Sequence, residues 1–249
     1  MAQFALSGKN AVVTGGSSGI GAATVRWLAE AGASVCIGYY RGAERAEALR
    51  QSLPGQGHMI AHVALVEPST MAAVAAEIGR HSGKLDILVN SAGFTQPVPH
   101  KDIDGLDEAL FDQILIANAR GPFSAIRTFM PLLQRSGDAV VINVSSISAF
   151  TGSGSNIAYC AAKAALDTMT MSFARVFGPN VRFLCVSPAQ VATDFVAGRD
   201  RASMEEAAKS TPLKRVVEPE DVAQAIGACI THLRTATGTT IVVDGGRHL

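Results

Sequence analysis

The feature that most constrains the fold of this chain is a regular alternation of two kinds of segment. Short apolar runs of strand length occur at 10–14, 34–40, 58–65, 86–90, 139–145, 181–187 and 239–243, and segments of helical period occur at 20–31, 44–53, 69–81, 106–135 and 158–177. Strands that alternate with helices form βαβ units and a parallel sheet. Because such crossovers are right-handed and cover both faces, we predict a doubly wound, Rossmann-type α/β sheet.

The domain organisation follows from what does not interrupt this alternation. No linker, change of composition or internal repeat divides residues 1–249, so we predict one domain. The segment 194–219 fits the alternation poorly, because it is charged and contains Gly198, Pro212 and Pro219, with one short helix expected near 204–209. Its place after a late strand predicts a lid on the substrate side, and a plain surface excursion is the alternative.

Composition and charge exclude several classes of function. Lys plus Arg and Asp plus Glu both number 21, so no basic excess favours binding to nucleic acid or to an anionic membrane. No stretch of about 18 apolar residues predicts a membrane span, and the N-terminus lacks the apolar run of a signal peptide, so we expect a cytoplasmic protein. The four cysteines and six histidines show no ligand spacing, so we expect no metal.

A glycine-rich turn stands between the first predicted strand and the first predicted helix. It runs from Thr14 to Gly21 and contains Gly15, Ser17, Ser18, Gly19, Ile20 and Gly21. Glycines at this point let backbone N–H groups approach a pyrophosphate, which the N-terminus of the helix then stabilises through its dipole. Placed in a βαβ series, the turn predicts a dinucleotide-binding site, although glycine clusters also serve as ordinary turns.

The end of the second predicted strand indicates which dinucleotide binds. An acidic residue there accepts a hydrogen bond from the ribose 2′-OH of NAD and repels a 2′-phosphate. Tyr39 stands at the expected position of the acid, Tyr40 and Arg41 follow, and no acid occurs before Glu44. We therefore predict NADP(H) as the cofactor, with a solvated loop cation as the alternative interpretation of Arg41.

Two side chains in a later helical segment suggest acid–base chemistry. Tyr159 and Lys163 are four residues apart, so both project from one helix face, about one turn apart. An ammonium beside a phenol lowers the phenol pKa from about 10 toward neutrality, which creates a general acid or base. Ser146 follows the end of the strand 139–145 and has a hydroxyl that can polarise the same carbonyl oxygen. Alone, however, the Tyr159–Lys163 spacing is common on helix surfaces.

Together these motifs resemble the short-chain dehydrogenase/reductase family over nearly the whole chain. The matching positions are the turn 14–21, Asn90-Ser91-Ala92-Gly93, Asn118, Ser146, Tyr159, Lys163, the segment 188–193 and Val243-Asp244-Gly245-Gly246. The resemblance implies an oxidoreductase that moves hydride between a nicotinamide and a carbonyl carbon. It implies that Tyr159 exchanges the proton, that Ser146 orients the substrate oxygen and that Lys163 binds the nicotinamide ribose.

The resemblance also assigns expected roles to further residues. Asn118 is expected to hold a water that links Lys163 to solvent, and Val191 and Thr193 are expected to hold the carboxamide. The predicted cofactor-binding residues are Gly15, Ser17, Ser18, Gly19, Ile20, Gly21, Tyr39, Tyr40, Arg41, Asn90, Ala92, Gly93, Tyr159, Lys163, Pro188, Val191 and Thr193. The predicted substrate-pocket residues are Phe94, Gln96, Ser148, Phe150, Asn156, Gln190 and Phe195. The chain departs from the family pattern at Ser91, at Ala189, and at Ala64, where an Asp is usual.

The reaction expected is reduction of a small or acyl-type ketone, such as a 3-oxoacyl thioester. An NAD-dependent sugar or steroid alcohol dehydrogenase is the alternative within enzymes, and a non-catalytic dinucleotide-sensing protein is the alternative outside them. The resemblance further implies a homotetramer or homodimer in which the helices around 106–135 and 156–177 pair between subunits.

Overall fold

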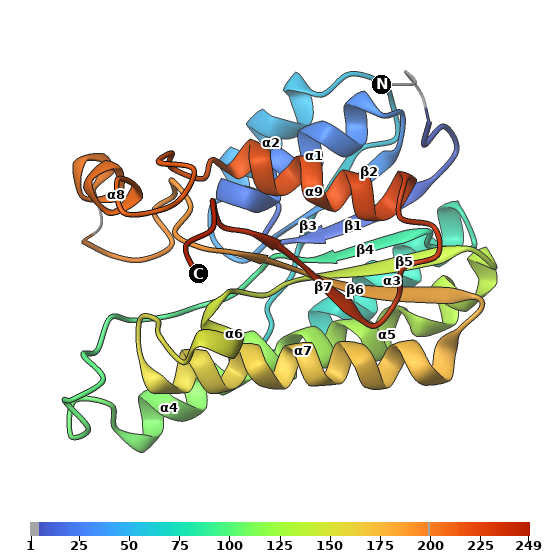
Figure 1. Cartoon of the computed structure of the whole chain (residues 1–249). Helices are drawn as coiled ribbons and strands as arrows, with labels where there is room; N and C mark the ends of the chain where they lie inside the picture. The colour runs from blue at the N-terminus through green and yellow to red at the C-terminus, as the bar shows by residue number, and fades with distance from the viewer. Residues whose placement is uncertain (1–4, 199) are drawn as a thin grey trace.

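A single parallel sheet forms the centre of the computed structural model, which describes residues 5–198 and 200–249 (Figure 1). Its strand order is β3-β2-β1-β4-β5-β6-β7, and every neighbouring pair is parallel. The strands are β1 Asn10–Thr14, β2 Ser34–Tyr39, β3 Met59–His62, β4 Ile87–Asn90, β5 Ala139–Val144, β6 Val181–Pro188 and β7 Thr239–Val243. The order reverses between β1 and β4, which opens a crevice at the carboxyl ends of these strands. The predicted doubly wound sheet is confirmed.

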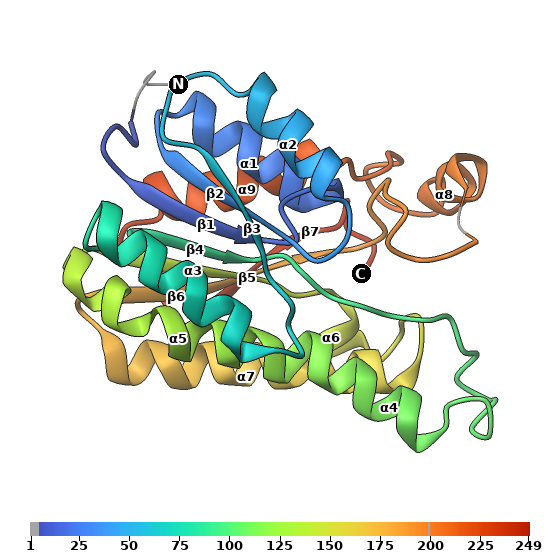
Figure 2. The same ribbon diagram turned by 180° about the vertical axis from the view of Figure 1, so that it is seen from behind.

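Helices cover both faces of the sheet. Their bounds are α1 Gly19–Glu30, α2 Ala43–Ser52, α3 Pro68–His81, α4 Glu108–Leu115, α5 Gly121–Ser136, α6 Ser148–Thr151, α7 Ile157–Phe177, α8 Arg201–Ala208 and α9 Pro219–Thr231, with the π-helix η1 at Ile116–Arg120. The two opposite views show α1, α2 and α9 on one face and α3, α5 and α7 on the other (Figures 1 and 2). Helix α8 stands away from the sheet, next to the C-terminus.

Two apolar cores hold these layers together. The first lies under α1 and α9 and contains the fully buried side chains of Leu28, Ile37 and Ile226. The second lies under α3 and α5 and includes Met71 and Phe129. Strands β1, β4, β5 and β6 contribute buried residues to both cores. This double burial explains why these strands consist of continuous apolar runs and do not alternate with polar residues.

The long helical segment predicted over 106–135 is interrupted in the structure. Helix α4 ends at Leu115, the π-helix η1 follows, and α5 begins at Gly121. The N–H of Gly121 donates to the carbonyl of Ile116, which is the wider hydrogen-bond spacing of a π-turn. Pro122 has no N–H, so the carbonyl of Asn118 lacks its α-helical donor. The interruption therefore gives Asn118 a backbone acceptor outside the regular helical pattern.

Three other elements differ from the sequence-based prediction. Helix α9 has no counterpart there, although Glu218 and Asp221 form a reciprocal capping box at its start. Strand β3 is shorter than the predicted 58–65, and the lid helix α8 begins and ends before the predicted 204–209. Among the helices of the described residues, none is both long and apolar enough to cross a membrane.

Candidate active site

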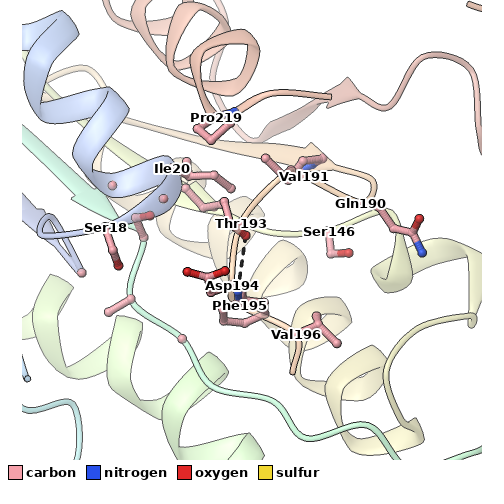
Figure 3. A pocket seen from close by; sticks show the side chains of 18 of the residues that line it. Ser18, Ile20, Ser146, Gln190, Val191, Thr193, Asp194, Phe195, Val196 and Pro219 are labelled. Atoms are coloured by element: carbon pink, nitrogen blue, oxygen red, sulfur yellow. Dashed lines mark hydrogen bonds between the residues drawn. The ribbon is translucent and has the colours of Figure 1, made fainter. Parts of the chain in front are cut away.

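A cavity of about 1000 Å³ lies at the carboxyl ends of the strands. Its walls come from the turn after β1, the ends of β2, β4, β5 and β6, and the first turns of α7. Figure 3 shows this cavity from close by, with Ser18 and Ile20 on one side and Ser146 and Gln190 on the other. The cavity lies at the switch point between β1 and β4. Open α/β sheets bind their ligands at such a point.

The turn after β1 forms a cradle that only glycine allows. Gly15 has a φ of +66°, and a Cβ there would lie 2.8 Å from the Cα of Ala92. A Cβ on Gly21 would lie 2.2 Å from the carbonyl oxygen of Gly15. All six predicted turn residues line the cavity, and α1 begins at Gly19 within it. The cradle and the helix N-terminus therefore fit a pyrophosphate.

The turn after β4 is attached to this cradle. Thr14 Oγ1 accepts hydrogen bonds from the N–H groups of Ser91 and Ala92, both at 3.2 Å. Ala92 and Gly93 line the cavity, as predicted residues of the cofactor site. The Asn90 side chain lies outside the cavity lining, because its Nδ2 donates to Asn143 Oδ1 at 2.8 Å between β4 and β5. Asn90 thus ties the strands together and does not face the cofactor site.

Tyr159 and Lys163 lie on one face of α7 and both line the cavity. The Asn156 side chain caps this helix by accepting the N–H of Tyr159 at 2.7 Å. Lys163 Nζ lies 5.5 Å from the centroid of the Tyr159 ring and donates to the carbonyl of Val144 at 2.8 Å. The bond to the end of β5 fixes the ammonium beside the phenol, so the expected pairing of the two side chains is present.

The charge on Lys163 is held in a dry environment. Burial lowers its pKa from 10.5 to about 8, and the nearby Cys185 and Asp167 offset part of that effect. Burial raises the pKa of Asp167 in turn. One oxygen of Asp167, Oδ1, is buried and has no hydrogen-bond partner among the described residues. A lysine with a pKa near neutrality is characteristic of functional sites.

Ser146 stands just after β5 and lines the same cavity. Its Oγ accepts the N–H of Ser148 at 3.1 Å and donates to the Ser148 hydroxyl at 3.1 Å. Asn118 is fully buried and outside the lining, with Nδ2 donating to the carbonyls of Phe94 and Ile114. Asn118 Oδ1 lacks a hydrogen-bond partner in the described part of the chain. An orphaned buried acceptor of this kind is a site for an ordered water.

The end of β2 brings cations and aromatic rings to the cavity. Tyr40 and Arg41 line it, and the Arg41 guanidinium carbon lies 5.4 Å from the centroid of the Tyr40 ring. Arg45 lines the cavity as well, from the first turn of α2. Tyr39 does not, because its ring makes an edge contact with His62 at 5.8 Å and packs against the first core. Tyr39, which was predicted to bind the cofactor, therefore packs against the core, whereas Arg41 and Arg45 face the cavity.

The segment after β6 closes the middle of the cavity. Pro188, Val191 and Thr193 all line it, and a Cβ on Gly19 would lie 3.0 Å from Thr193 Cγ2. The Thr193 hydroxyl accepts the N–H of Phe195 at 3.4 Å, which Figure 3 marks with a dashed line. This segment thus spans from the glycine-rich turn toward the catalytic side.

The predicted substrate-side residues divide into two groups. Ser148, Gln190 and Phe195 line the cavity, and the Phe195 ring lies 6.1 Å from that of Tyr159. Four others lie outside the lining: Phe94, Gln96, Phe150 and Asn156. The Asn156 side chain caps α7 through its oxygen and donates through its nitrogen to the Thr95 hydroxyl and the Gln96 carbonyl. Phe94 packs against the cluster around Ile114. Phe150 is 51% exposed, and its ring contacts His248.

Three arginines of the cavity lining were missed by the sequence analysis. Arg26 comes from α1, Arg45 from α2 and Arg247 from the segment after β7. Arg26 and Arg45 lie in helices that follow the first two strands, so their positions gave a signal. Arg247 lies near the other end of the chain and carries no local signal. Within residues 5–198 and 200–249, no group of three or more His, Cys, Asp or Glu is placed to hold a metal ion.

Comparisons with known proteins agree with this geometry. A family model described as enoyl-(acyl carrier protein) reductase matches residues 15–248. One relative is provisionally described as ketoacyl reductase 2 of the granaticin polyketide synthase of Streptomyces violaceoruber. It is 35% identical to this chain over 241 residues, which cover 96% of each chain. The cis-4-hydroxycyclohexanecarboxylate dehydrogenase of Sinomonas cyclohexanicum is 32% identical and matches over 95% of each chain.

A solved structure extends the similarity to three dimensions. The solved structure of a Burkholderia xenovorans protein, provisionally described as a short-chain dehydrogenase/reductase, superposes with a TM-score of 0.88. The two sequences are 31% identical, and the match covers 96% of this chain and 97% of the other. The residues that the family model matches, 15–248, include the turn after β1, the end of β5 and α7. This chain therefore belongs to the short-chain dehydrogenase/reductase family of oxidoreductases.

Proposed function

We propose that this protein is an NADP(H)-dependent ketoreductase that interconverts a ketone and a secondary alcohol. The observation that carries the proposal is the meeting of two half-sites in one cavity. The glycine cradle of Gly15 and Gly21 forms one half, and Ser146, Tyr159 and Lys163 form the other. Together these residues would hold a nicotinamide dinucleotide, with the glycine cradle at its pyrophosphate. Bound there, the reduced nicotinamide supplies the hydride that the protein itself lacks.

The side chains supply the proton chemistry of the proposed reaction. Tyr159 donates a proton to the substrate oxygen during reduction, and Ser146 holds that oxygen through its hydroxyl. Lys163 stabilises the phenolate with its buried ammonium, which its hydrogen bond to Val144 keeps beside the ring. The orphaned side-chain oxygen Oδ1 of Asn118 supports a water that carries protons between Lys163 and solvent.

The cations at the end of β2 support NADP(H) over NAD(H). Arg41 and Arg45 line the cavity there, and neither takes part in an ion pair among the described residues. A 2′-phosphate brings up to two negative charges to this place, and each charge-assisted hydrogen bond stabilises it by about 1.5–3 kcal/mol. One such bond corresponds to a preference for NADPH over NADH of roughly ten- to a hundredfold.

The cofactor choice is tested with Arg41→Ala and Arg45→Ala, alone and together. We expect the ratio of kcat/KM for NADPH to that for NADH to fall at least tenfold in the double variant. Arg50→Ala is the matched control, since Arg50 lies on the same helix as Arg45, is paired with Glu47 and is outside the cavity lining. A wild type that uses both cofactors equally, or prefers NADH, contradicts the assignment.

The substrate class proposed is a small or acyl-type ketone. Ketoacyl reduction is the activity in the name of the Streptomyces relative, which supports a 3-oxoacyl thioester. The Sinomonas relative is named as a dehydrogenase of a cyclic hydroxy acid, which supports a ring ketone and a second candidate function, oxidation of a cyclic alcohol. A non-catalytic dinucleotide sensor is disfavoured by the joint presence of Ser146, Tyr159 and Lys163 in the cavity.

The deciding experiment measures turnover of a ketone panel by the purified protein with each reduced cofactor. Tyr159→Phe removes the transferable proton and little else, so we expect kcat to fall by about 100- to 10,000-fold with the NADPH dissociation constant nearly unchanged. Lys163→Ala is expected to weaken both chemistry and cofactor binding. Activity of Tyr159→Phe above a few per cent of wild type contradicts the mechanism.

The lid and the assembly complete the proposal. Residues 194–196 line the cavity and continue toward α8, which supports the segment 194–219 as a substrate-side lid. On the face formed by α5 and α7, Phe123, Met171 and Val176 are exposed, and the Phe123 and Phe173 rings lie 6.1 Å apart. Such an apolar face supports a homotetramer or homodimer. A monomeric mass by light scattering at micromolar concentration contradicts it.

A further inference from the structure

The segment after β7 folds into a turn fixed by one carboxylate. Asp244 accepts the N–H of Gly246 at 2.8 Å and the N–H of His248 at 2.9 Å, and His248 Nδ1 lies 2.6 Å from Asp244 Oδ2. Gly245 and Gly246 take the left-handed φ values of +64° and +83°. A Cβ on Gly246 would lie 2.7 Å from Pro212 Cγ, so the turn packs closely against the lid segment. The backbone on both sides of Arg247 is therefore held in place.

This turn brings Arg247 to the substrate side of the cavity. Arg247 lines the main cavity, and it also lines a small adjoining cavity together with Gln190, which follows β6. The neighbouring His248 ring lies 5.8 Å from the Phe150 ring, on the short helix α6 that begins with Ser148. Gln190 and Ser148 are both on the substrate side of the lining. Arg247 consequently lies next to the segment after β6 that carries Gln190.

The Arg247 guanidinium has no carboxylate partner among the described residues. Within the described part of the chain, its one hydrogen bond goes from Nη1 to the Ala207 carbonyl on α8, at 3.5 Å. The oxygens of Asp244 already accept from Gly246 and His248. Two acids line the cavity, Asp194 and Glu220, and neither forms an ion pair with Arg247 among the described residues. The side chain is thus a cation with unused donors at the edge of the substrate space.

We propose that Arg247 determines specificity by binding a carboxylate that the substrate carries at the end remote from its carbonyl. The planar guanidinium matches a carboxylate in a two-bond geometry, and such charge-assisted bonds are stronger than neutral ones. We commit to a carboxylate over the phosphate of a thioester carrier because Arg247 lines the same cavity as Ser146 and the Sinomonas relative is named for a hydroxy acid that carries a carboxylate. This inference rests on the proposed ketoreductase function and names its substrate class.

The test uses two ketones that differ in one charge. We compare kcat/KM for 4-oxocyclohexanecarboxylate and for its neutral carboxamide, in the wild type and in Arg247→Gln. We expect the wild type to prefer the acid by about ten- to a hundredfold, and the variant to lose at least nine-tenths of that preference. Arg215→Gln is the matched control, because Arg215 lies in the lid, lines the small cavity only and is paired with Asp221. The control is expected to keep the wild-type preference.

A binding measurement supports the kinetics without turnover. Cyclohexanecarboxylate and cyclohexanecarboxamide lack a reducible ketone, so their dissociation constants are measured by calorimetry in the presence of NADPH. We expect the wild type to bind the acid at least tenfold more tightly than the amide, and Arg247→Gln to bind the two within about threefold. The dissociation constant of NADPH itself is measured in parallel and is expected to stay at the wild-type value in the variant.

The outcomes separate this inference from the proposed function. If no ketone is turned over with either cofactor, the proposed function fails. If ketones are reduced but the wild type shows no preference for the acid, or Arg247→Gln lowers both substrates equally, the inference alone is overturned and Arg247 holds the lid through Ala207. If Arg247→Gln impairs acetoacetyl-coenzyme A but not the oxo acid, or weakens NADPH, the guanidinium binds phosphate and the carboxylate assignment is wrong.

Discussion

The buried ammonium of Lys163 makes a quantitative prediction about how stability depends on pH. Burial lowers its pKa from 10.5 to about 8 in the folded protein. A lysine whose folded pKa is depressed destabilises the fold while it is charged, since the unfolded chain binds the proton more tightly. The fall in pKa from 10.5 to about 8 corresponds to about 3 kcal/mol at pH values below 8. This cost disappears as the pH rises from about 8 toward 10.5.

Lys163→Met isolates this effect, because methionine fills similar space and carries no charge. The free energy of unfolding is measured by denaturant titration at pH 7 and at pH 9, for both proteins without cofactor. Between these two values the wild type is expected to gain about 1 kcal/mol relative to the variant. The difference between the two proteins cancels the titrating groups that do not interact with Lys163, whereas Asp167 and Cys185 interact with it. Measurements stop at pH 9 because cysteine thiols ionise in the unfolded chain above that pH. In the folded protein, burial raises the pKa of Cys36 and Cys185 above the usual 9.0.

A difference in stability that stays flat from pH 7 to pH 9 refutes the reasoning. It would mean that the ammonium is solvated in the folded protein, or that Asp167 compensates its burial fully. A difference that changes in the opposite direction would mean that the folded protein binds this proton more tightly than the unfolded chain. In each case the folded protein would hold the charged ammonium without the destabilisation that we predict from its burial.

Two glycine substitutions test the closest backbone approaches. Gly21→Ala places a Cβ 2.2 Å from the Gly15 carbonyl oxygen, so the cradle must open. We expect the NADPH dissociation constant, measured by fluorescence titration, to rise at least tenfold. An unchanged dissociation constant contradicts the fit of the cradle to the cofactor. Gly227→Ala places a Cβ 2.2 Å from Trp27 between α1 and α9, so we expect a loss of about 1–3 kcal/mol in the free energy of unfolding. Gly79→Ala, whose nearest contact is 3.8 Å away, is the control for both and is expected to cost little.

Several parts of the molecule were predictable because their causes are local. The apolar runs that became β1, β4, β5 and β6 are buried on both faces, and continuous burial leaves a clear signature in sequence. The cradle after β1 needs glycine at Gly15 and Gly21 for reasons of space that few other residues satisfy. Tyr159 and Lys163 share a helix face because of their spacing alone.

Other assignments depended on contacts between distant segments. Tyr39 and Arg41 are two residues apart, yet only Arg41 faces the cavity, because His62 on β3 and the first core take up the Tyr39 ring. Asn156 is consumed by the cap of α7 and by its hydrogen bonds across to 95–96. Whether such a side chain stabilises the fold or contacts a ligand depends on which segments pack against it.

The sequence by itself determined the succession of strands along the chain, the glycine cradle and the Tyr159–Lys163 pair, since each follows from steric and periodic rules acting within a few residues. Only the tertiary structure decided that α5 starts anew at a π-turn beside Asn118 and that Arg247, which follows β7, stands beside Gln190, which follows β6. The physical reason is that a side chain's surroundings are set by whichever segments pack against it. In a parallel sheet, those segments come from strands that are far apart in the chain.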